Sequence, residues 1–227
     1  MPSEALFTSP HAECEEPHLW TAPDDSGSEV EVSQALSALV RLVKPRVVVE
    51  TGTYHGATTV LLAAAVKSNG RGHVYALELD EEAAAVARQR ITEEGLDGWA
   101  TIVHGDSLEW TPSGPIDFAF LDAGAGWHRV DEFRRLWGSM HRGSVVCVHD
   151  TARKNVMPRL GLRTLELQGM LSPVWVRSPR GLLIGQPRFP NPARRLAGWP
   201  FRISIRLYIG VRSRLGGLRR SVGLLQR

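Results

Sequence analysis

The sequence predicts a doubly wound α/β domain, in which helices cover both faces of a mostly parallel β-sheet. One observation is that short apolar runs alternate with segments of helical periodicity along the middle of the chain. Another is that the apolar runs are nearly continuous, as in strands that are buried on both faces. A third is that the last two runs, 172–178 and 181–186, are separated by two residues, which favours an antiparallel hairpin at one edge.

The alternation begins with a helix that starts near Glu29. Leu36, Leu39, Val40 and Val43 recur at helical spacing, and Pro45 ends this pattern. The elements expected next are a strand at 46–50, a helix at 57–67, a strand at 73–79, a helix at 81–95, strands at 100–105 and 116–122, a helix near 130–141 and a strand at 144–150.

Charge is distributed unevenly along the 227 residues. Residues 1–31 hold eight acidic residues and no Lys or Arg, whereas twelve Arg and no acid lie between Leu167 and Arg227. We therefore expect an acidic mobile tail at 1–28, one domain at 29–187 and an Arg-rich extension at 188–227.

Several protein classes are disfavoured. The first residues lack the basic and apolar regions of a secretory signal, and the longest apolar run, Val60–Val66, is too short to span a membrane. The two cysteines form neither a disulfide framework nor a zinc motif. We expect a cytoplasmic protein.

The Arg-rich extension has three interpretations. Its apolar face could pack on the domain or on a second copy in a homodimer, leaving the Arg side chains in water. It could instead attach the protein peripherally to an anionic membrane, because each basic group near such a surface contributes about 1 kcal/mol. Binding to nucleic acid is the third interpretation and the least favoured, since no recognition motif is present.

A glycine-rich turn follows the first predicted strand, in the segment VVVETGTYHGATT at 47–59. Gly52 and Gly56 allow a tight turn and a close approach of ligand to the backbone. The dinucleotide fingerprint needs further glycines where Tyr54 and Ala57 stand, so nicotinamide or flavin binding is disfavoured.

Polar residues also follow the next two strands. Glu78 ends the second strand, where a carboxylate can accept hydrogen bonds from ribose hydroxyls, and Asp106 and Ser107 follow the third. Because open α/β sheets bind ligands at the carboxyl ends of their strands, these residues indicate a nucleotide-like ligand.

Together with IDFAFLDA and RGSVVCVHDT, these segments resemble the class I S-adenosylmethionine (SAM) methyltransferases, and in particular the small O-methyltransferases related to catechol and macrocin O-methyltransferases. The resemblance covers about 30–187 and implies a Rossmann-like, seven-stranded sheet. It implies that SAM is held at its methionine end by Glu50, Gly52, Tyr54 and Gly56, at its ribose by Glu78, and at its adenine by Asp106 and Ser107, with Asp122 close by.

The resemblance also implies a metal site. In metal-dependent relatives, carboxylates at the positions of Asp122 and Asp150 hold Mg²⁺, which prefers oxygen ligands. This sequence departs from the pattern, because His149 stands in the second ligand pair and no Lys occurs at 123–126. A histidine base is the alternative, with His149 the first candidate and His128 the second, since imidazole can accept a proton near neutral pH.

The function implied is transfer of a methyl group from SAM to a hydroxyl of a small molecule or sugar-like intermediate. Two alternatives stay open at this level. One is a SAM- or nucleotide-binding domain without catalysis that acts as a membrane-attached or scaffolding partner. The other is an aminopropyl transferase.

Overall fold

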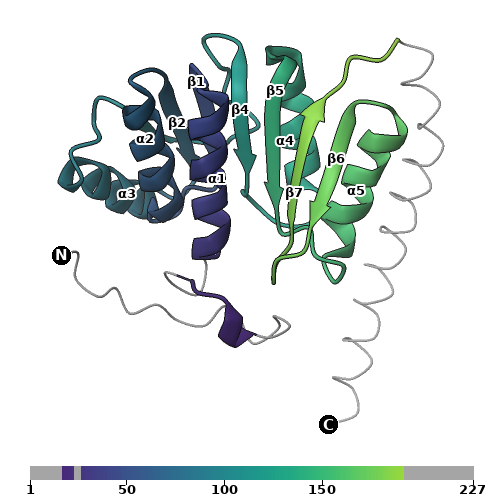
Figure 1. Ribbon diagram of the computed structural model, residues 1–227, viewed down its shortest axis with the longest axis horizontal. Coiled ribbons are helices and arrows are strands. Elements are labelled where there is room, and N and C mark those ends of the chain that lie inside the picture. The colour runs from purple at the N-terminus through teal and green to yellow at the C-terminus, as the bar shows by residue number, and fades with distance from the viewer. Residues whose placement is uncertain (1–16, 23–26, 192–227) are drawn as a thin grey trace, which may run out of the picture.

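The computed structural model describes residues 17–22 and 27–191 (Figure 1). The predictions for the first sixteen residues, and those for the Arg-rich extension from residue 192 onward, lie outside this part of the chain. A dimer or membrane contact through that extension therefore stays a prediction.

The described residues form one sheet of seven strands, in the order β3-β2-β1-β4-β5-β7-β6 (Figure 1). The strands β1 to β5 are parallel, and β7 runs antiparallel to both β5 and β6. The predicted doubly wound, mostly parallel fold with a terminal antiparallel pair is confirmed. The strand bounds are β1 Val47–Thr51, β2 His73–Glu78, β3 Ala100–His104, β4 Ile116–Leu121, β5 Met140–His149, β6 Leu171–Val176 and β7 Leu182–Pro187.

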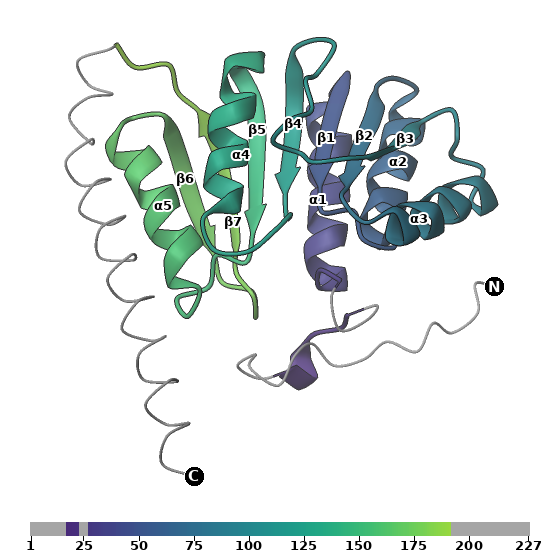
Figure 2. The ribbon, with the colours of Figure 1, turned by 180° about the vertical axis from the view of Figure 1, so that it is seen from behind.

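Helices cover both faces of this sheet, as the opposite views of Figures 1 and 2 show. α1 (Val30–Val43), α2 (Ala57–Asn69) and α3 (Glu81–Glu93) share one apolar cluster with the sheet. α4 (His128–Leu136) and α5 (Val156–Leu167) share a second cluster on the other face. Successive strand residues alternate between the two clusters, which is why the apolar runs are nearly continuous.

Two segments differ from the sequence expectation. The helix predicted near 130–141 ends at Leu136, because Met140 already pairs with Ile116 at the start of β5. The sequence pattern does not predict α5, since Pro158 and Gly161 both disfavour a helix. Pro158 is tolerated because it lies in the first turn, where its missing N–H needs no partner.

Gly161 is required where α5 meets α4. A Cβ at this position would lie 2.4 Å from Cγ2 of Val130, a fully buried side chain. We expect Gly161→Ala to lower the free energy of unfolding by about 1–3 kcal/mol through overpacking, as measured by urea denaturation. Gly98→Ala is the matched control, because a Cβ there meets nothing within 4 Å. Equal stability of the two variants would contradict this packing.

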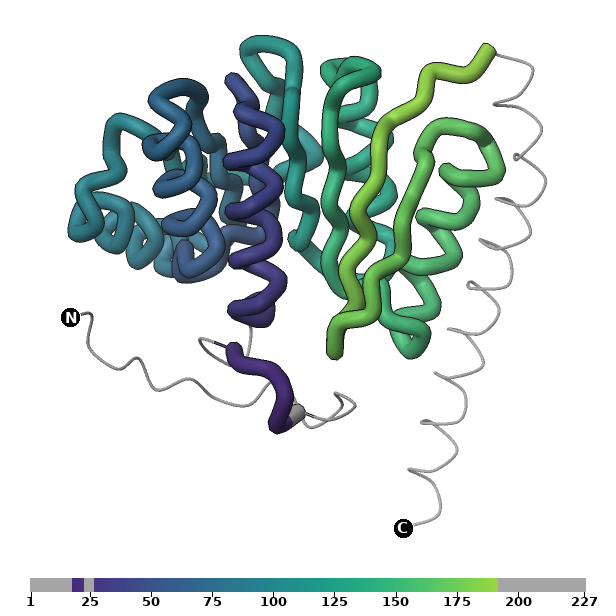
Figure 3. The backbone as a smooth tube through the Cα atoms, viewed as in Figure 1, coloured from purple at the N-terminus to yellow at the C-terminus, as the bar shows by residue number. Residues whose placement is uncertain are grey.

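Part of the expected acidic tail contacts the domain. A short 3₁₀ turn at Pro17–Leu19 precedes Thr21, whose carbonyl accepts a hydrogen bond from Val30 N at 2.9 Å. Thr21 Oγ1 also donates to Glu31 Oε1 at 3.0 Å. In Figure 3 this segment lies beyond the N-terminal end of α1. It therefore helps to fix the residues that enter α1.

Among the described residues, every helix is too short or too polar to cross a membrane.

Candidate functional site

A cavity of about 500 Å³ lies at the carboxyl ends of the parallel strands. This is the edge where open α/β sheets bind ligands, because the loops after successive strands meet there. Residues after β1, β2, β3 and β4 line it, and Arg180 reaches it from the turn before β7. Six of the predicted cofactor-binding residues are in its wall: Gly52, Tyr54, Glu78, Asp106, Ser107 and Asp122.

Backbone geometry makes Gly52 necessary at this wall. Its φ is +73°, and a Cβ would lie 2.8 Å from the backbone of Ala123. The chain after β1 can therefore pass close to the chain after β4 only at a glycine. Tyr54 also has a positive φ of 49°.

Glu78 fixes the turn on the other side of the cavity. Its Oε2 accepts a hydrogen bond from Tyr54 N at 2.6 Å, and its Oε1 accepts one from Asp80 N at 3.0 Å. A carboxylate has about four acceptor positions, so both oxygens keep capacity for ligand hydroxyls. The carboxylate is thus oriented before any ligand binds.

Glu50 and Gly56 lie outside the main cavity. Glu50 lines a narrow recess beside it, together with Gly52 and Tyr54, and is almost fully buried. Burial raises its pKa to about 8, and the nearby charges of Asp122 and Glu78 add to the effect, although a 2.6 Å hydrogen bond from Thr59 opposes it.

Gly56 acts through packing instead. It has a φ of +78° and precedes the first residue of α2, and a Cβ there would lie 3.1 Å from the Ala87 side chain on α3. Gly56 therefore sets the start of α2 and its approach to α3.

His128 lies in the cavity wall, with a side chain 28% exposed. Its Nε2 is 3.3 Å from Ser107 Oγ and 3.6 Å from Oε1 of the buried Glu132. The interaction of its ring with the Glu132 carboxylate raises the pKa of His128. Gly124 makes room for this ring, since a Cβ there would be 2.6 Å from it.

His149 lies in a different environment, fully buried behind the cavity. Its Nε2 is 2.6 Å from Oε2 of Glu29, which is also fully buried, and its Nδ1 is 3.1 Å from both carboxylate oxygens of Asp122. Burial alone would lower the pKa of His149, but Asp122 and Glu29 outweigh burial and raise the pKa to about 9. Both nitrogens are committed to carboxylates, so the geometry does not favour His149 as a base for substrate.

Two arginines complete a charge cluster around His149. Arg129 Nη2 donates to Asp122 Oδ1 at 2.9 Å and to Asp150 Oδ2 at 2.8 Å. Arg180 holds Asp150 through Nε and Nη2, and its backbone N–H donates to Glu29 Oε1 at 2.8 Å. We call the group consisting of Glu29, Asp122, Arg129, His149, Asp150 and Arg180 the charge cluster.

The predicted metal ligands Asp122 and Asp150 do lie together, and with His149 they form a group of atoms within 4.8 Å of one another. Their oxygens are nevertheless all in use. Asp122 accepts from Arg129, His149 and Ser28, and Asp150 accepts from both arginines. A divalent cation would have to displace positively charged donors, so this residue set does not fit Mg²⁺.

Sequence reasoning missed four residues that shape the site: Glu29, Arg129, Glu132 and Arg180. In the sequence, Glu29 marks only the start of a helix, and Arg180 is one of many arginines in a segment without acidic residues. The sequence shows only that Arg129 and Glu132 lie three residues apart on one helix face. The structure adds that both are buried despite their charge, which is unusual. Glu29 and His149 are 120 residues apart, and no local pattern links them.

Comparisons with known proteins show which proteins this chain is similar to. Residues 49–151 match the family model described as a methyltransferase domain. A catechol O-methyltransferase from Niastella koreensis is 34% identical over 94 residues, which cover 39% of this chain and 42% of that protein. The methyltransferase resemblance inferred from the strand-end motifs is thereby confirmed.

Another relative acts on a different acceptor. The catalytic subunit of a tRNA (adenine(58)-N(1))-methyltransferase from Dictyostelium discoideum is 27% identical over 140 residues, covering 58% of this chain and 43% of that protein. The chain thus spans less than half the length of these two curated relatives. An O-methyltransferase from Bacillus cereus, solved with S-adenosylhomocysteine (SAH), superposes with a TM-score of 0.62 at 22% identity, over 73% of this chain and 84% of that one, which supports the fold.

Proposed function

Because residues 49–151 match the model of a methyltransferase domain, we propose that this protein transfers the methyl group of SAM to a hydroxyl of a small molecule. The observation that carries the proposal is the cavity at the carboxyl ends of the strands, whose wall contains six of the residues predicted to hold SAM. Its volume of about 500 Å³ is in the range of small-molecule and cofactor sites.

The cofactor would lie across the ends of β1, β2 and β3. Glu78, already oriented by two backbone N–H groups, would accept hydrogen bonds from the ribose hydroxyls. Asp106 and Ser107 would face the adenine. Gly52 and Tyr54 would face the methionine end, with Glu50 in the adjoining recess.

The protein's part in the reaction is to align the methyl donor with the acceptor oxygen and to exclude water. His128 is the predicted base that the geometry supports, because its ring forms part of the cavity wall. Its contact with Glu132 would stabilise the imidazolium formed when it takes the acceptor proton. His149, enclosed by Glu29 and Asp122, would instead hold Asp122 in place.

The test combines binding with turnover. Calorimetry with SAM should show one binding site, and labelled SAM should transfer its methyl group to at least one member of a panel of phenolic, catechol, sugar and lipid-linked hydroxyls, with tRNA included. Binding without transfer to any acceptor would favour a non-catalytic domain. Binding of decarboxylated SAM in preference to SAM would favour aminopropyl transfer, and no binding of either would refute the proposal.

Glu50 gives this proposal a pH-dependent signature. Its pKa of about 8 keeps it protonated near pH 7, and a cationic group of SAM in the recess would lower that pKa. We expect SAM binding near pH 7 to release about one proton, and release should vanish above about pH 9, where Glu50 is already ionised. Calorimetry in buffers of different ionisation enthalpy measures this number.

Glu50→Gln is the control, because it should bind SAM without releasing the proton. In the ligand-free protein, the raised pKa means that the contribution of Glu50 to stability is present below about pH 4.5 and lost as the pH rises through about 8. The Gln variant should therefore show a flatter dependence of stability on pH. Unchanged proton release by this variant would assign the proton to another group.

A further inference from the structure

The charge cluster contains Asp122 and Asp150, the two residues that the family resemblance implies as metal ligands. Arg129 Nη2 bridges the two carboxylates implied as metal ligands, at 2.9 Å from Asp122 Oδ1 and 2.8 Å from Asp150 Oδ2. The Arg129 side chain is only 4% exposed. A single buried, positively charged nitrogen thus occupies the bridging position between the two carboxylates.

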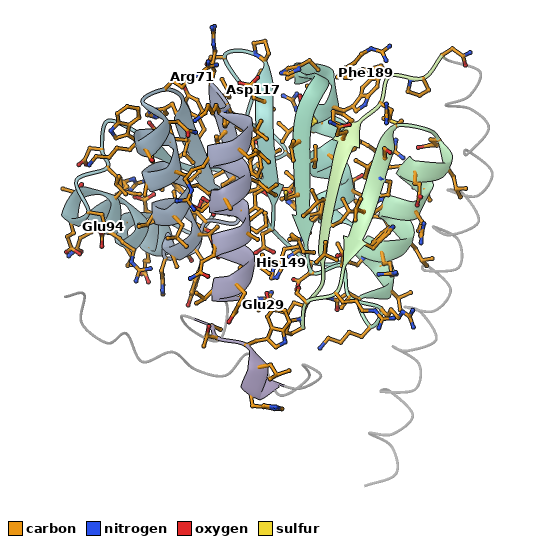
Figure 4. The ribbon with its side chains drawn as sticks, in the orientation of Figure 1. Glu29, Arg71, Glu94, Asp117, His149 and Phe189 are labelled. Atoms are coloured by element: carbon orange, nitrogen blue, oxygen red, sulfur yellow. The ribbon has the colours of Figure 1, made fainter. Side chains whose placement is uncertain are left out.

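The positive charges in the cluster match its negative charges in number. Three carboxylates, from Glu29, Asp122 and Asp150, contact three basic side chains, Arg129, His149 and Arg180. Figure 4 labels two of these partners, Glu29 and His149, near each other at the lower end of the strands. Adding a divalent cation to this balanced set would place two uncompensated charges in a largely buried site, which is unfavourable.

The cluster is also held rigidly. Arg180 O accepts a hydrogen bond from Ala152 N at 2.8 Å, and Gly181 O accepts one from Thr151 N at 3.1 Å. A Cβ at Gly181 would lie 2.1 Å from Ala152 N, so the backbone of this turn packs directly against the backbone after β5. The backbone of Arg180 therefore cannot move away from Asp150 unless these hydrogen bonds break.

We propose that the site between Asp122 and Asp150 holds no divalent cation, because Arg129 takes the position between the two carboxylates. Cation exclusion follows from the contacts within the cluster alone and does not depend on the proposed function.

The experiment titrates the full chain with Mn²⁺, a spectroscopic substitute for Mg²⁺, and follows the free ion by electron paramagnetic resonance. We expect no stoichiometric binding by the parent chain at millimolar Mn²⁺, and no effect of Mg²⁺ or chelator on its melting temperature. Arg180→Met and Arg129→Met, which each free carboxylate oxygens, should bind Mn²⁺ at least about tenfold more tightly than the parent.

Arg88→Met is the matched control, since Arg88 pairs with Glu81 on the surface, away from the cluster. It should behave like the parent. Submillimolar Mn²⁺ binding by the parent that Mg²⁺ displaces would overturn the proposal. Parent-like affinity in both cluster variants, with folding confirmed by circular dichroism, would also overturn it.

SAM binding is measured in the same samples with chelator present. Loss of SAM binding by the parent would count against the proposed function and leave the Mn²⁺ result standing.

Discussion

Glu29→Ala should lower the free energy of unfolding by about 3–5 kcal/mol, the largest change in stability that we expect in the chain. The substitution leaves His149 buried with Nε2 facing no acceptor, and it removes the acceptor of Arg180 N. Burial alone would raise the pKa of Glu29, but the bond and charge of His149 keep it lowered, so the lost group is an ionised carboxylate. Urea denaturation followed by circular dichroism measures the change.

Two further variants test whether the loss of stability comes from the lost contact with His149. Glu29→Gln keeps an oxygen that can accept from His149, and it should lose less stability than Glu29→Ala. Glu82→Ala, at an exposed acidic position in the first turn of α3, should change stability by less than about 0.5 kcal/mol. A Glu29→Ala variant as stable as Glu82→Ala would mean that the buried contact with His149 contributes little.

Glu78→Ala should weaken SAM binding about 10- to 100-fold, because hydrogen bonds to a charged acceptor contribute about 1.5–3 kcal/mol. The variant also releases Tyr54 N and Asp80 N from the carboxylate, so the turn after β1 loses its fixed position. Calorimetry with SAM and with SAH measures both affinities, and both should fall by a similar factor, since ribose is common to the two ligands.

The controls for this prediction separate binding from folding. Glu78→Gln keeps one acceptor oxygen and should bind SAM with an intermediate affinity. Asp97→Ala removes an acid on the loop after α3, outside the cavity wall, and should leave the affinity unchanged. Parent-like affinity in a folded Glu78→Ala variant would remove the ribose role from Glu78.

Local patterns in the sequence were enough to predict the fold and the edge of the sheet that carries the site. Buried strands such as β1 and β4 read as continuous apolar runs because both faces are covered. A turn after a strand has a recognisable spacing, which predicts that Gly52 and Glu78 lie at this edge, and both line the cavity. α5 was missed because its Pro158 and Gly161 are accommodated only by the end of the helix and by contact with Val130.

The doubly wound sheet, the glycine turn and the acidic residues at the strand ends are predictable from local sequence, since each depends on neighbours only a few positions away. Which polar residues contact one another depends on segments far apart in the chain, so only the folded structure shows it. Glu29 reaches His149 across 120 positions and Arg180 across 151. Both ring nitrogens of His149, the first predicted base, therefore contact carboxylates. Arginine side chains bind Asp122 and Asp150, the predicted metal ligands. The physical reason is that a buried charge is stable only with an opposite charge beside it.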